Sequence, residues 1–513
     1  MSSDTLSPGM RAMAARVSGD DYPAWRRQVE RVKFCSRPVR VAGHASAVDP
    51  SSGEVQASFS SADQPDGTLL ITCGDRRAAV CPSCAETYRR DMWHVVVSGL
   101  QGRTSATSSG THTGARGAAV ETAVPTSVAS HPRLFITLTA PSFGPVHRAG
   151  GAACRPRSGR GRTCPHGRPA GCGLVHETDH QVIGSPLCPE CYDYTGAVLW
   201  NAHAGELWRR TRIGIDRALA PVASDATGDR VTVAGVRDLL RVSYVKVSEF
   251  QRRGLVHLHL VVRLDGVDPD GGGDIVAPPV WATADLLASA VRRAVGTAAV
   301  PLPSPDGTLR VAQWGTQVDI SDVSVGGAVG DSRRVAAYLA KYATKTASDS
   351  IGASGVLASR FRRLHRRWLR RKVGAHLARM VETAWDLGGR RDLAPLKLRS
   401  WAHTLGFKGH FATKSRRYSV TLGALRAARR VWRAGESVRA GRADVWASAR
   451  ASGAAVVGDW AYVGRGYRTS SDADLAAAMA REHAIAVEEY RDLKRRESDV
   501  DYWSTLTHYP GDL

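Results

Sequence analysis

The stretch RGLVHLHLVVRL, residues 253 to 264, decides the fold because its polar and apolar positions alternate. Successive side chains of a β-strand point to opposite faces, so the pattern predicts a strand with His257 and His259 on one face. The opposite face is hydrocarbon and consists of Val256, Leu258, Leu260 and Val262. A strand of this kind is anchored in a core by one face and presents two imidazoles on the other.

The surrounding sequence predicts further strands and helices. RVSYVKVSEF (241–250) alternates in the same way, and QRRG (251–254) reads as the hairpin turn between the two strands. RLFITLTAPSFG (133–144) is rich in β-branched and aromatic residues, and Pro141 ends this third strand. Helical periodicity is found at 196–219, 281–295 and 331–347. These elements together predict an α+β protein.

The charge of the chain indicates a polyanionic partner. The 513 residues carry a formal charge of +22, and the segment 360–442 holds 23 Lys or Arg against four Asp or Glu. Such a segment predicts a surface for nucleic-acid phosphates, although basic segments are often only solvated faces. Arg416 and Arg417, in the stretch TKSRRYSV, are the predicted DNA contacts of this region, together with Lys345 further upstream.

The sequence contains neither a run of about 18 apolar residues nor the apolar core of a signal peptide at its start. We therefore expect a cytoplasmic protein with no membrane partner. Thiols stay reduced in that compartment, so the nine cysteines are interpreted as metal ligands rather than as disulfides.

Two groups of cysteines predict structural Zn²⁺ sites. In the first, Cys81 and Cys84 form a CPSC knuckle that Cys73 and Cys35 complete. The second lies in a Gly/Pro/Arg-rich segment, 150–195, which is too polar to fold without a metal. It offers seven ligands: Cys154, Cys164, Cys172, Cys188, Cys191, His166 and His176. The predicted set of four is Cys164, Cys172, Cys188 and Cys191; the alternative is free thiols in a loop.

The segment YLAKYATK (338–345) places two phenols on one helical face, since Tyr338 and Tyr342 are four residues apart. Lys341 and Lys345 form a neighbouring stripe. A phenol with its ordinary pKa near 10 needs help to attack a phosphorus atom, and a metal ion or a lysine supplies that help. The alternative interpretation is a tyrosine pair packed in a core.

The histidine pair is the predicted site for that metal ion. Two imidazoles two residues apart on a strand can share one divalent cation. Glu249 and Gln251 lie just across the predicted turn, and either could add a third ligand to His257 and His259. With open positions left over, such a set suits Mg²⁺ or Mn²⁺ gripping a phosphate. Two satisfied or surface histidines are the simpler alternative.

The order of these motifs, FITLTAP (135–141), GLVHLHLVV (254–262) and YLAKYATK, resembles that of the HUH endonucleases. More narrowly, it resembles the replication initiators of actinobacterial rolling-circle plasmids, and the similarity extends over residues 70 to 435. The resemblance implies a central antiparallel sheet with helices on one side, the histidines on a central strand and the tyrosines on a packed helix. The first motif would be a structural strand beside the histidine strand.

The resemblance also implies a mechanism and roles for residues. One tyrosine, Tyr338 or Tyr342, would cut a strand at the double-strand origin and form a 5′-phosphotyrosine bond, and a second transfer would rejoin the displaced strand. His257, His259 and Glu249 would hold Mg²⁺ or Mn²⁺. Lys341 would contact the scissile phosphate. A host helicase and a DNA polymerase would be further partners, since the sequence contains no P-loop.

The sequence predicts four regions. These are 1–100 with the first zinc knuckle, a linker at 101–130, a nuclease core at 131–350 with the zinc insertion at 150–195, and a basic, mostly helical DNA-binding region at 351–513. Two other functions remain open. One is a relaxase or transposase with the same chemistry, and the other is a non-catalytic zinc-containing DNA-binding regulator.

Overall fold

The computed structural model of the chain describes residues 7–102, 124–150, 154, 163–169, 171–271, 274–323, 329–345, 357, 360–439 and 445–506. It is a mixed α+β structure whose contacts divide it into two units. One unit combines 1–75 and 81–85 with 433–513, and the other contains 76–80 and 86–432. The larger unit holds the histidine and tyrosine motifs. Most of the predicted linker at 101–130 lies outside the described residues.

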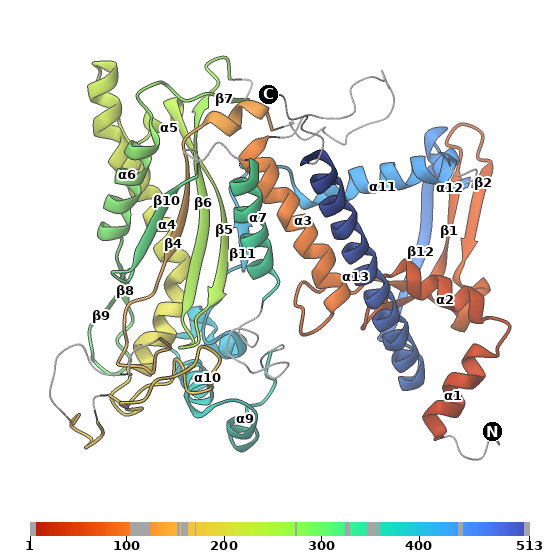
Figure 1. Ribbon diagram of the computed structural model, residues 1–513, viewed down its shortest axis with the longest axis horizontal. Helices are drawn as coiled ribbons and strands as arrows, with labels where there is room; N and C mark the ends of the chain where they lie inside the picture. Colours follow the sequence, from red (N-terminus) through yellow and green to blue (C-terminus); the bar gives the residue numbers. More distant parts are fainter. Residues whose placement is uncertain are drawn as a thin grey trace, which may run out of the picture. The chain divides into compact units, whose positions relative to one another are not determined.

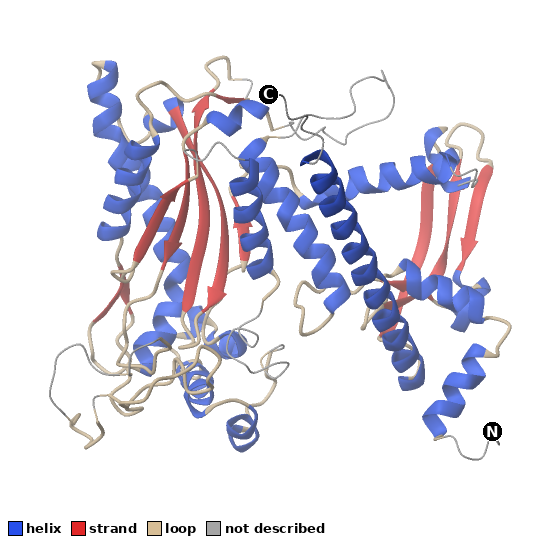
Figure 2. Cartoon of the chain, in the orientation of Figure 1, coloured by secondary structure: helices blue, strands red, loops and turns tan. Residues whose placement is uncertain are grey.

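The central sheet of the larger unit is built around the strand predicted within residues 253–264. That segment forms β6 (Val256–Val267), which pairs with β5 (Leu240–Phe250) on one side and β4 (Arg133–Leu138) on the other. The strand order is β10-β4-β6-β5-β11, and every pair is antiparallel (Figure 2). β7 also pairs with β6, at the C-terminal end of that strand. The three remaining strands are β10 (Val318–Asp322), β11 (Ala412–Lys414) and β7 (Ile275–Val276). The three strands expected from the sequence and the turn at 251–254 are confirmed.

Helices cover both faces of this sheet (Figure 1). On one face, the buried residues of α4 (Tyr194–Thr227) and α6 (Ala284–Thr297) pack on the hydrocarbon side of β6. On the other face lie α3 (Pro82–Gln101) and α7 (Val329–Ala343), packed against Val245, Val247 and Val261. The expectation of helices on one side only is therefore wrong. The histidine face also has apolar positions, which α3 and α7 bury.

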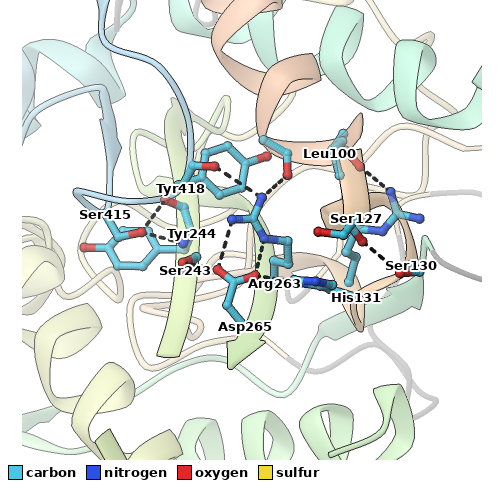
Figure 3. A network of polar contacts seen from close by, with 12 residues as sticks. Leu100, Ser127, Ser130, His131, Ser243, Tyr244, Arg263, Asp265, Ser415 and Tyr418 are labelled. Carbon is cyan, nitrogen blue, oxygen red and sulfur yellow. Dashed lines mark hydrogen bonds and ion pairs between the residues drawn. The ribbon is translucent and has the colours of Figure 1, made fainter. Parts of the chain in front are cut away.

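A polar network attaches α3 to the histidine face of the sheet (Figure 3). The Arg263 guanidinium donates to both carboxylate oxygens of Asp265, at 2.6 and 2.9 Å, and to the backbone carbonyls of Gly99 and Tyr418. Asp265 also accepts from Ser243, at 2.7 Å, and contacts His131 Nδ1 at 2.8 Å. Although burial opposes ionisation, His131 and Arg263 hold the pKa of Asp265 below its ordinary value. Arg263 thus bonds a carbonyl at the C-terminal end of α3, where positive charge is favourable.

Shorter elements complete the larger unit. The helices α9 (Arg366–Lys372) and α10 (Ala375–Leu387) follow the tyrosine helix, and α10 packs against α4. The other elements are α5 (Val236–Leu239), β8 (Val300–Leu302), β9 (Arg310–Ala312), the 3-10 segments Thr126–Ser130, Ala394–Leu396 and Leu398–Thr404, and α11 (Leu422–Arg439), which continues into the smaller unit.

The smaller unit joins the two ends of the chain. Its sheet has the order β12-β1-β2, with β3 also paired to β1. β1 (Val39–Val48) pairs along its whole length with β12 (Ala455–Arg465). The unit also contains β2 (Val55–Ser60), β3 (Leu69–Ile71), the 3-10 segments Ser61–Asp63 and Pro65–Gly67, and the helices α1 (Pro8–Val17), α2 (Tyr22–Arg31), α12 (Val445–Ala451) and α13 (Ser470–Leu506). Strand pairing between distant segments thus places both ends of the sequence in one unit, and the two units differ from the four predicted regions.

Two strands interrupt the basic C-terminal region, which the sequence predicted to be mostly helical. β11 is the edge strand of the central sheet, and β12 belongs to the smaller unit. Within the described part of the chain, no helix combines the length and the apolar character needed to cross a membrane.

Candidate functional site

The hairpin of β5 and β6 brings the predicted metal ligands together. Glu249 and His257 are paired directly across the two strands, so their side chains share one face. Gln251, the alternative third ligand, lies in the turn, where its side-chain oxygen accepts from Arg253 at 2.9 Å. Gly254 closes the turn with φ +78°, a conformation that favours glycine. The register of the hairpin therefore places Glu249, rather than Gln251, beside the two histidines.

His259 is the point at which the site converges. Its Nε2 atom lies 3.3 Å from Glu249 Oε2 and 3.3 Å from Tyr338 Oη. Its Nδ1 atom lies 3.3 Å from the hydroxyl of Thr137, which is paired with His259 across β4 and β6. The Thr137 contact fixes the orientation of the ring and directs Nε2 toward the carboxylate and the phenol.

The tyrosines approach the histidines from α7. The rings of Tyr338 and Tyr342 are 4.6 Å apart, and those of Tyr342 and His259 are 5.3 Å apart. Lys345 Nζ lies 4.3 Å from the centre of the Tyr342 ring and 3.2 Å from Glu249 Oε1. Lys341 is exposed, with its amine 5.9 Å from the same ring. The structure therefore gathers the six predicted catalytic and metal-ligating residues, with Lys341 at the solvent side of the cluster. Lys345, predicted as a DNA contact, is a seventh member and lies inside the cluster.

Burial sets the protonation states in this cluster. Desolvation, followed by the influence of neighbouring His259, lowers the pKa of His257 to about 4. His257 is therefore neutral near pH 7, the form that binds metal ions. Burial also raises the pKa of Tyr338, and the neighbouring Tyr342 and Glu249 add to the shift. Without a nearby cation, the Tyr338 phenol stays protonated and is a weak nucleophile.

The donor set fits a divalent cation. Two imidazoles and a carboxylate form a ligand set open to substrate oxygens, and the buried Nδ1 atom of His257 has no hydrogen-bond partner in the described structure. The ligand atoms of Glu249, His257 and His259 do not all lie as close together as those of the three cysteine-containing groups found among the described residues.

Two residues of the first motif also belong to the site, although the resemblance implies only a structural strand there. Phe135 stacks on His259, with ring centres 6.1 Å apart and planes inclined by 8°, and meets the edge of Tyr338. Thr137 contacts His259 as described above. The sequence signal was the alternation along β4, which places Phe135 and Thr137 on the same face once this strand is paired with β6.

The first cysteine group assembles as the sequence predicted. Cys35, Cys73, Cys81 and Cys84 place their sulfurs within 4.8 Å of one another in the smaller unit. The Sγ–Sγ distances are 3.6 Å for Cys73–Cys84 and 3.7 Å for Cys81–Cys35 and Cys84–Cys35. A disulfide would need about 2.05 Å, whereas two thiolates about 2.3 Å from one zinc ion in tetrahedral geometry lie about 3.8 Å apart.

The predicted grouping of the second cysteine set is wrong, because the structure separates Cys172 from its three proposed partners. Cys164, Cys188 and Cys191 lie together with His166. Cys172 joins Cys154, His176 and His147. Sequence distance did not reveal this division, because each group takes its ligands from two separate parts of the segment.

The basic region contributes both structural and exposed arginines. Arg370 and Arg366 pair with Glu382, which fixes α9 to α10. Trp368 on α9 is 46% exposed, whereas the adjacent Leu369 is buried. The exposed Arg367, Trp368, Arg371 and Lys372 form a basic aromatic surface on α9. Such a surface can hold phosphates and stack on bases.

The two predicted arginine contacts lie elsewhere on the larger unit. Arg416 and Arg417 follow β11. Burial lowers the pKa of Arg241, and the positive charge of the neighbouring Arg417 lowers the pKa of Arg241 further. Within β11, Lys414 pairs with Val245, whereas Ala412 pairs with Val247, which in turn pairs with His259. Arg416 and Arg417 follow Lys414 and therefore lie beyond the end of β11 that is farther from His259. The structure therefore does not bring Arg416 and Arg417 into the cluster around His259.

The fold and the site define an α+β protein with a histidine–carboxylate–tyrosine cluster on a central antiparallel strand and an adjoining helix, in a strongly basic chain. Comparison with known proteins gives its family. Residues 21–481 match the family described as "Replication initiator protein, pSAM2", and the chain belongs to this family. A protein of Streptomyces ambofaciens named "Replication initiator protein" is 38% identical over 494 residues, which cover 94% of this chain and 95% of that protein. No solved structure matches the chain.

Proposed function

We propose that the protein initiates rolling-circle replication of a plasmid by cutting and rejoining one DNA strand through a tyrosine. Membership of the replication initiator family supports the biological role, and the site supports the chemistry. The observation that carries the proposal is the convergence on His259 Nε2, which lies 3.3 Å from both a carboxylate oxygen and a phenol oxygen. A cation held beside His259 would supply positive charge next to the phenol that attacks the phosphate.

The ligands of that cation would be His257, His259 and Glu249. Mg²⁺ or Mn²⁺ at this position would polarise the phosphate and favour the phenolate form of the tyrosine. Lys345 lies beside Glu249 and over the Tyr342 ring, so its positive charge is placed to meet a DNA phosphate at the site. Exposed Lys341 is placed to meet the phosphate from the solvent side. The resemblance of the sequence motifs to those of the HUH endonucleases supports this assignment of roles.

In the proposed reaction, a tyrosine oxygen attacks the phosphorus atom and the bond from phosphorus to the 3′ oxygen breaks. The tyrosine loses its proton, the departing 3′ oxygen gains one, and the 5′ phosphate stays on the protein as a phosphotyrosine. Tyr338 is favoured for the first attack, because its oxygen contacts His259 and its side chain is 39% exposed. Tyr342 would serve the second transfer, which rejoins the displaced strand.

The DNA would bind along the basic region, with the α9 surface and the segment of Arg416 and Arg417 as contacts. Structural Zn²⁺ at the four-cysteine cluster would stabilise the smaller unit. A host helicase and a polymerase would extend the freed 3′ end. The cytoplasmic location expected from the sequence belongs to the same proposal.

The test is formation of a covalent adduct. Full-length protein is incubated with Mn²⁺ and overlapping single-stranded oligonucleotides that tile the DNA around its gene, and then denatured. We expect an adduct that resists denaturation, is lost in Tyr338→Phe and persists in Tyr490→Phe, an exposed tyrosine on α13 that serves as the control.

The other possible outcomes of this experiment distinguish between the alternative functions. An adduct lost only in Tyr342→Phe would reverse the order of the tyrosines. Binding without any adduct, or an adduct that survives the double Tyr338→Phe/Tyr342→Phe variant, would refute the chemistry and leave a non-catalytic DNA-binding regulator. An adduct with no plasmid replication in a transformation assay would favour a relaxase or transposase.

A further inference from the structure

The segment between β4 and α4 contains two separate groups of metal-ligand residues. One group consists of His147, Cys154, Cys172 and His176, and the other of Cys164, His166, Cys188 and Cys191. Together with the four-cysteine cluster of the smaller unit, these groups account for all nine cysteines of the chain. All nine are free thiols, so the use of every cysteine in a four-residue cluster points to metal binding rather than to disulfides.

The ligands of the two groups alternate in pairs along the chain. The order is His147 and Cys154 in the first group, Cys164 and His166 in the second, Cys172 and His176 in the first, and Cys188 and Cys191 in the second. Each group therefore closes a loop that encloses ligands of the other. The two sites are interlocked, and neither half of the segment can form its site alone.

The distances between ligand atoms fit two tetrahedral ions. In the first group, Cys172 Sγ lies 3.0 Å from His176 Nε2, which lies 3.2 Å from His147 Nδ1. In the second, His166 Nδ1 lies 3.3 Å from Cys191 Sγ and 3.8 Å from Cys188 Sγ. Around one zinc ion, with bonds of about 2.0–2.3 Å, such pairs lie roughly 3.3–3.6 Å apart.

Backbone hydrogen bonds hold ligand residues of both groups in position. Cys172 N donates to Cys154 O at 2.9 Å, and Cys154 N donates to Leu174 O at 2.8 Å. Cys164 starts a tight turn in which its own N–H donates to Arg168 O at 2.8 Å. Leu174 and Val175 are exposed, whereas Cys154, His176 and Cys188 are buried. Three of the eight ligand residues thus occupy interior positions that apolar side chains hold in an ordinary core.

We propose that the segment His147–Cys191 is a cross-braced module that binds two zinc ions, one through two cysteines and two histidines and one through three cysteines and a histidine. With the four-cysteine cluster, the chain would bind three zinc ions. Both ions are structural, because four protein ligands leave no open position for a substrate. The proposal does not depend on whether the protein cuts DNA.

The module is in contact with the turn that joins the two strands of the metal-ligand hairpin. Arg252 donates to His180 O at 3.1 Å, and a Cβ atom placed on Gly184 would lie 2.5 Å from the backbone of Arg252. Arg253 donates to the carbonyls of Ala140 and Pro141, at 2.6 and 2.8 Å, where the chain leaves β4 for the module. Zinc binding would therefore also fix the turn at 251–254.

The zinc content of the full-length protein tests the proposal. Metal analysis of purified wild type should give three equivalents per chain, and X-ray absorption at the zinc edge should give an average shell of three sulfurs and one nitrogen. The double variant Cys172→Ser/Cys188→Ser should retain one equivalent with a sulfur-only shell. His180→Ala, a histidine beside the first group but outside it, is the control and should retain three.

The alternative is a single ion shared by Cys164, Cys172, Cys188 and Cys191. That arrangement predicts two equivalents in the wild type and a shell with sulfur alone. Either result would overturn the two-ion module. The X-ray absorption measurement on the wild type remains decisive even if a variant fails to fold, because it needs no substitution.

Discussion

The contact between Thr137 and His259 gives the sharpest test of the candidate site. Replacing Thr137 with valine keeps the shape of the side chain and removes the hydroxyl 3.3 Å from His259 Nδ1. The imidazole then loses the partner that directs Nε2 toward Glu249. Groups that orient a metal-binding histidine typically contribute about 10- to 100-fold in metal affinity. Because 3.3 Å is at the long end of hydrogen-bond distances, we expect roughly a 10-fold weaker affinity, or about 1.4 kcal/mol.

Thr139 offers a matched control on the same face, two residues further along the chain. Its hydroxyl donates to Gln317 O at 2.7 Å and does not contact His259. Both Thr→Val variants lose one hydrogen bond, so each should lose about 1 kcal/mol of unfolding free energy. Only Thr137→Val should weaken Mn²⁺ binding.

The assay is Mn²⁺ titration followed by calorimetry or by the electron paramagnetic resonance of free Mn²⁺, alongside urea unfolding of each variant. An unchanged Mn²⁺ affinity in Thr137→Val, with the wild type binding measurably, would refute the orienting role. Equal weakening in Thr139→Val would do so as well, since the effect would then follow from stability.

Three further predictions concern the fold. Asp265→Asn should lower the unfolding free energy by about 3–5 kcal/mol, because it leaves the Arg263 guanidinium buried without its counter-charge; a urea melt changed by less than 1 kcal/mol would contradict this. Burial lowers the pKa of His376 to about 4, below the value of about 6.5 in the unfolded chain. The contribution of His376 to the free energy of unfolding should therefore be constant above pH 6.5 and fall by about 2 kcal/mol at pH 5. His376→Gln should flatten that pH dependence in unfolding titrations. Gly184→Ala should speed hydrogen exchange at residues 251–254, whereas Gly228→Ala, at a similar positive φ with nothing within 4 Å, should not.

The local sequence was enough to predict the hairpin and the faces of β6. Strand alternation has a period of two, so the positions of His257 and His259 opposite the hydrocarbon residues follow from spacing alone. The four-residue spacing of Tyr338 and Tyr342 likewise places both phenols on one face of a helix. These features depend only on the spacing of residues a few positions apart, and that spacing can be read from the sequence.

Features that join distant segments did not follow from the sequence. The pairing of β1 with β12 unites residues separated by about 400 positions, and no local pattern indicates that partner. The division of the second cysteine set has the same cause, since each group joins two ligand pairs that lie far apart in the sequence. The gap is 18 positions from Cys154 to Cys172 in one group and 22 positions from His166 to Cys188 in the other. The exposure of Trp368 also depends on which face of α9 meets α10.

The sequence by itself determined which chemical groups the protein has and how the nearest of them are spaced: two imidazoles on a strand, two phenols on a helix, nine thiols and a basic segment. Only the tertiary structure decided which groups meet. It placed Glu249, rather than Gln251, beside the histidines through the hairpin register, and it brought Thr137 and Phe135 to His259. The physical reason is that backbone geometry fixes short-range spacing, whereas contacts between distant segments depend on how whole strands and helices pack.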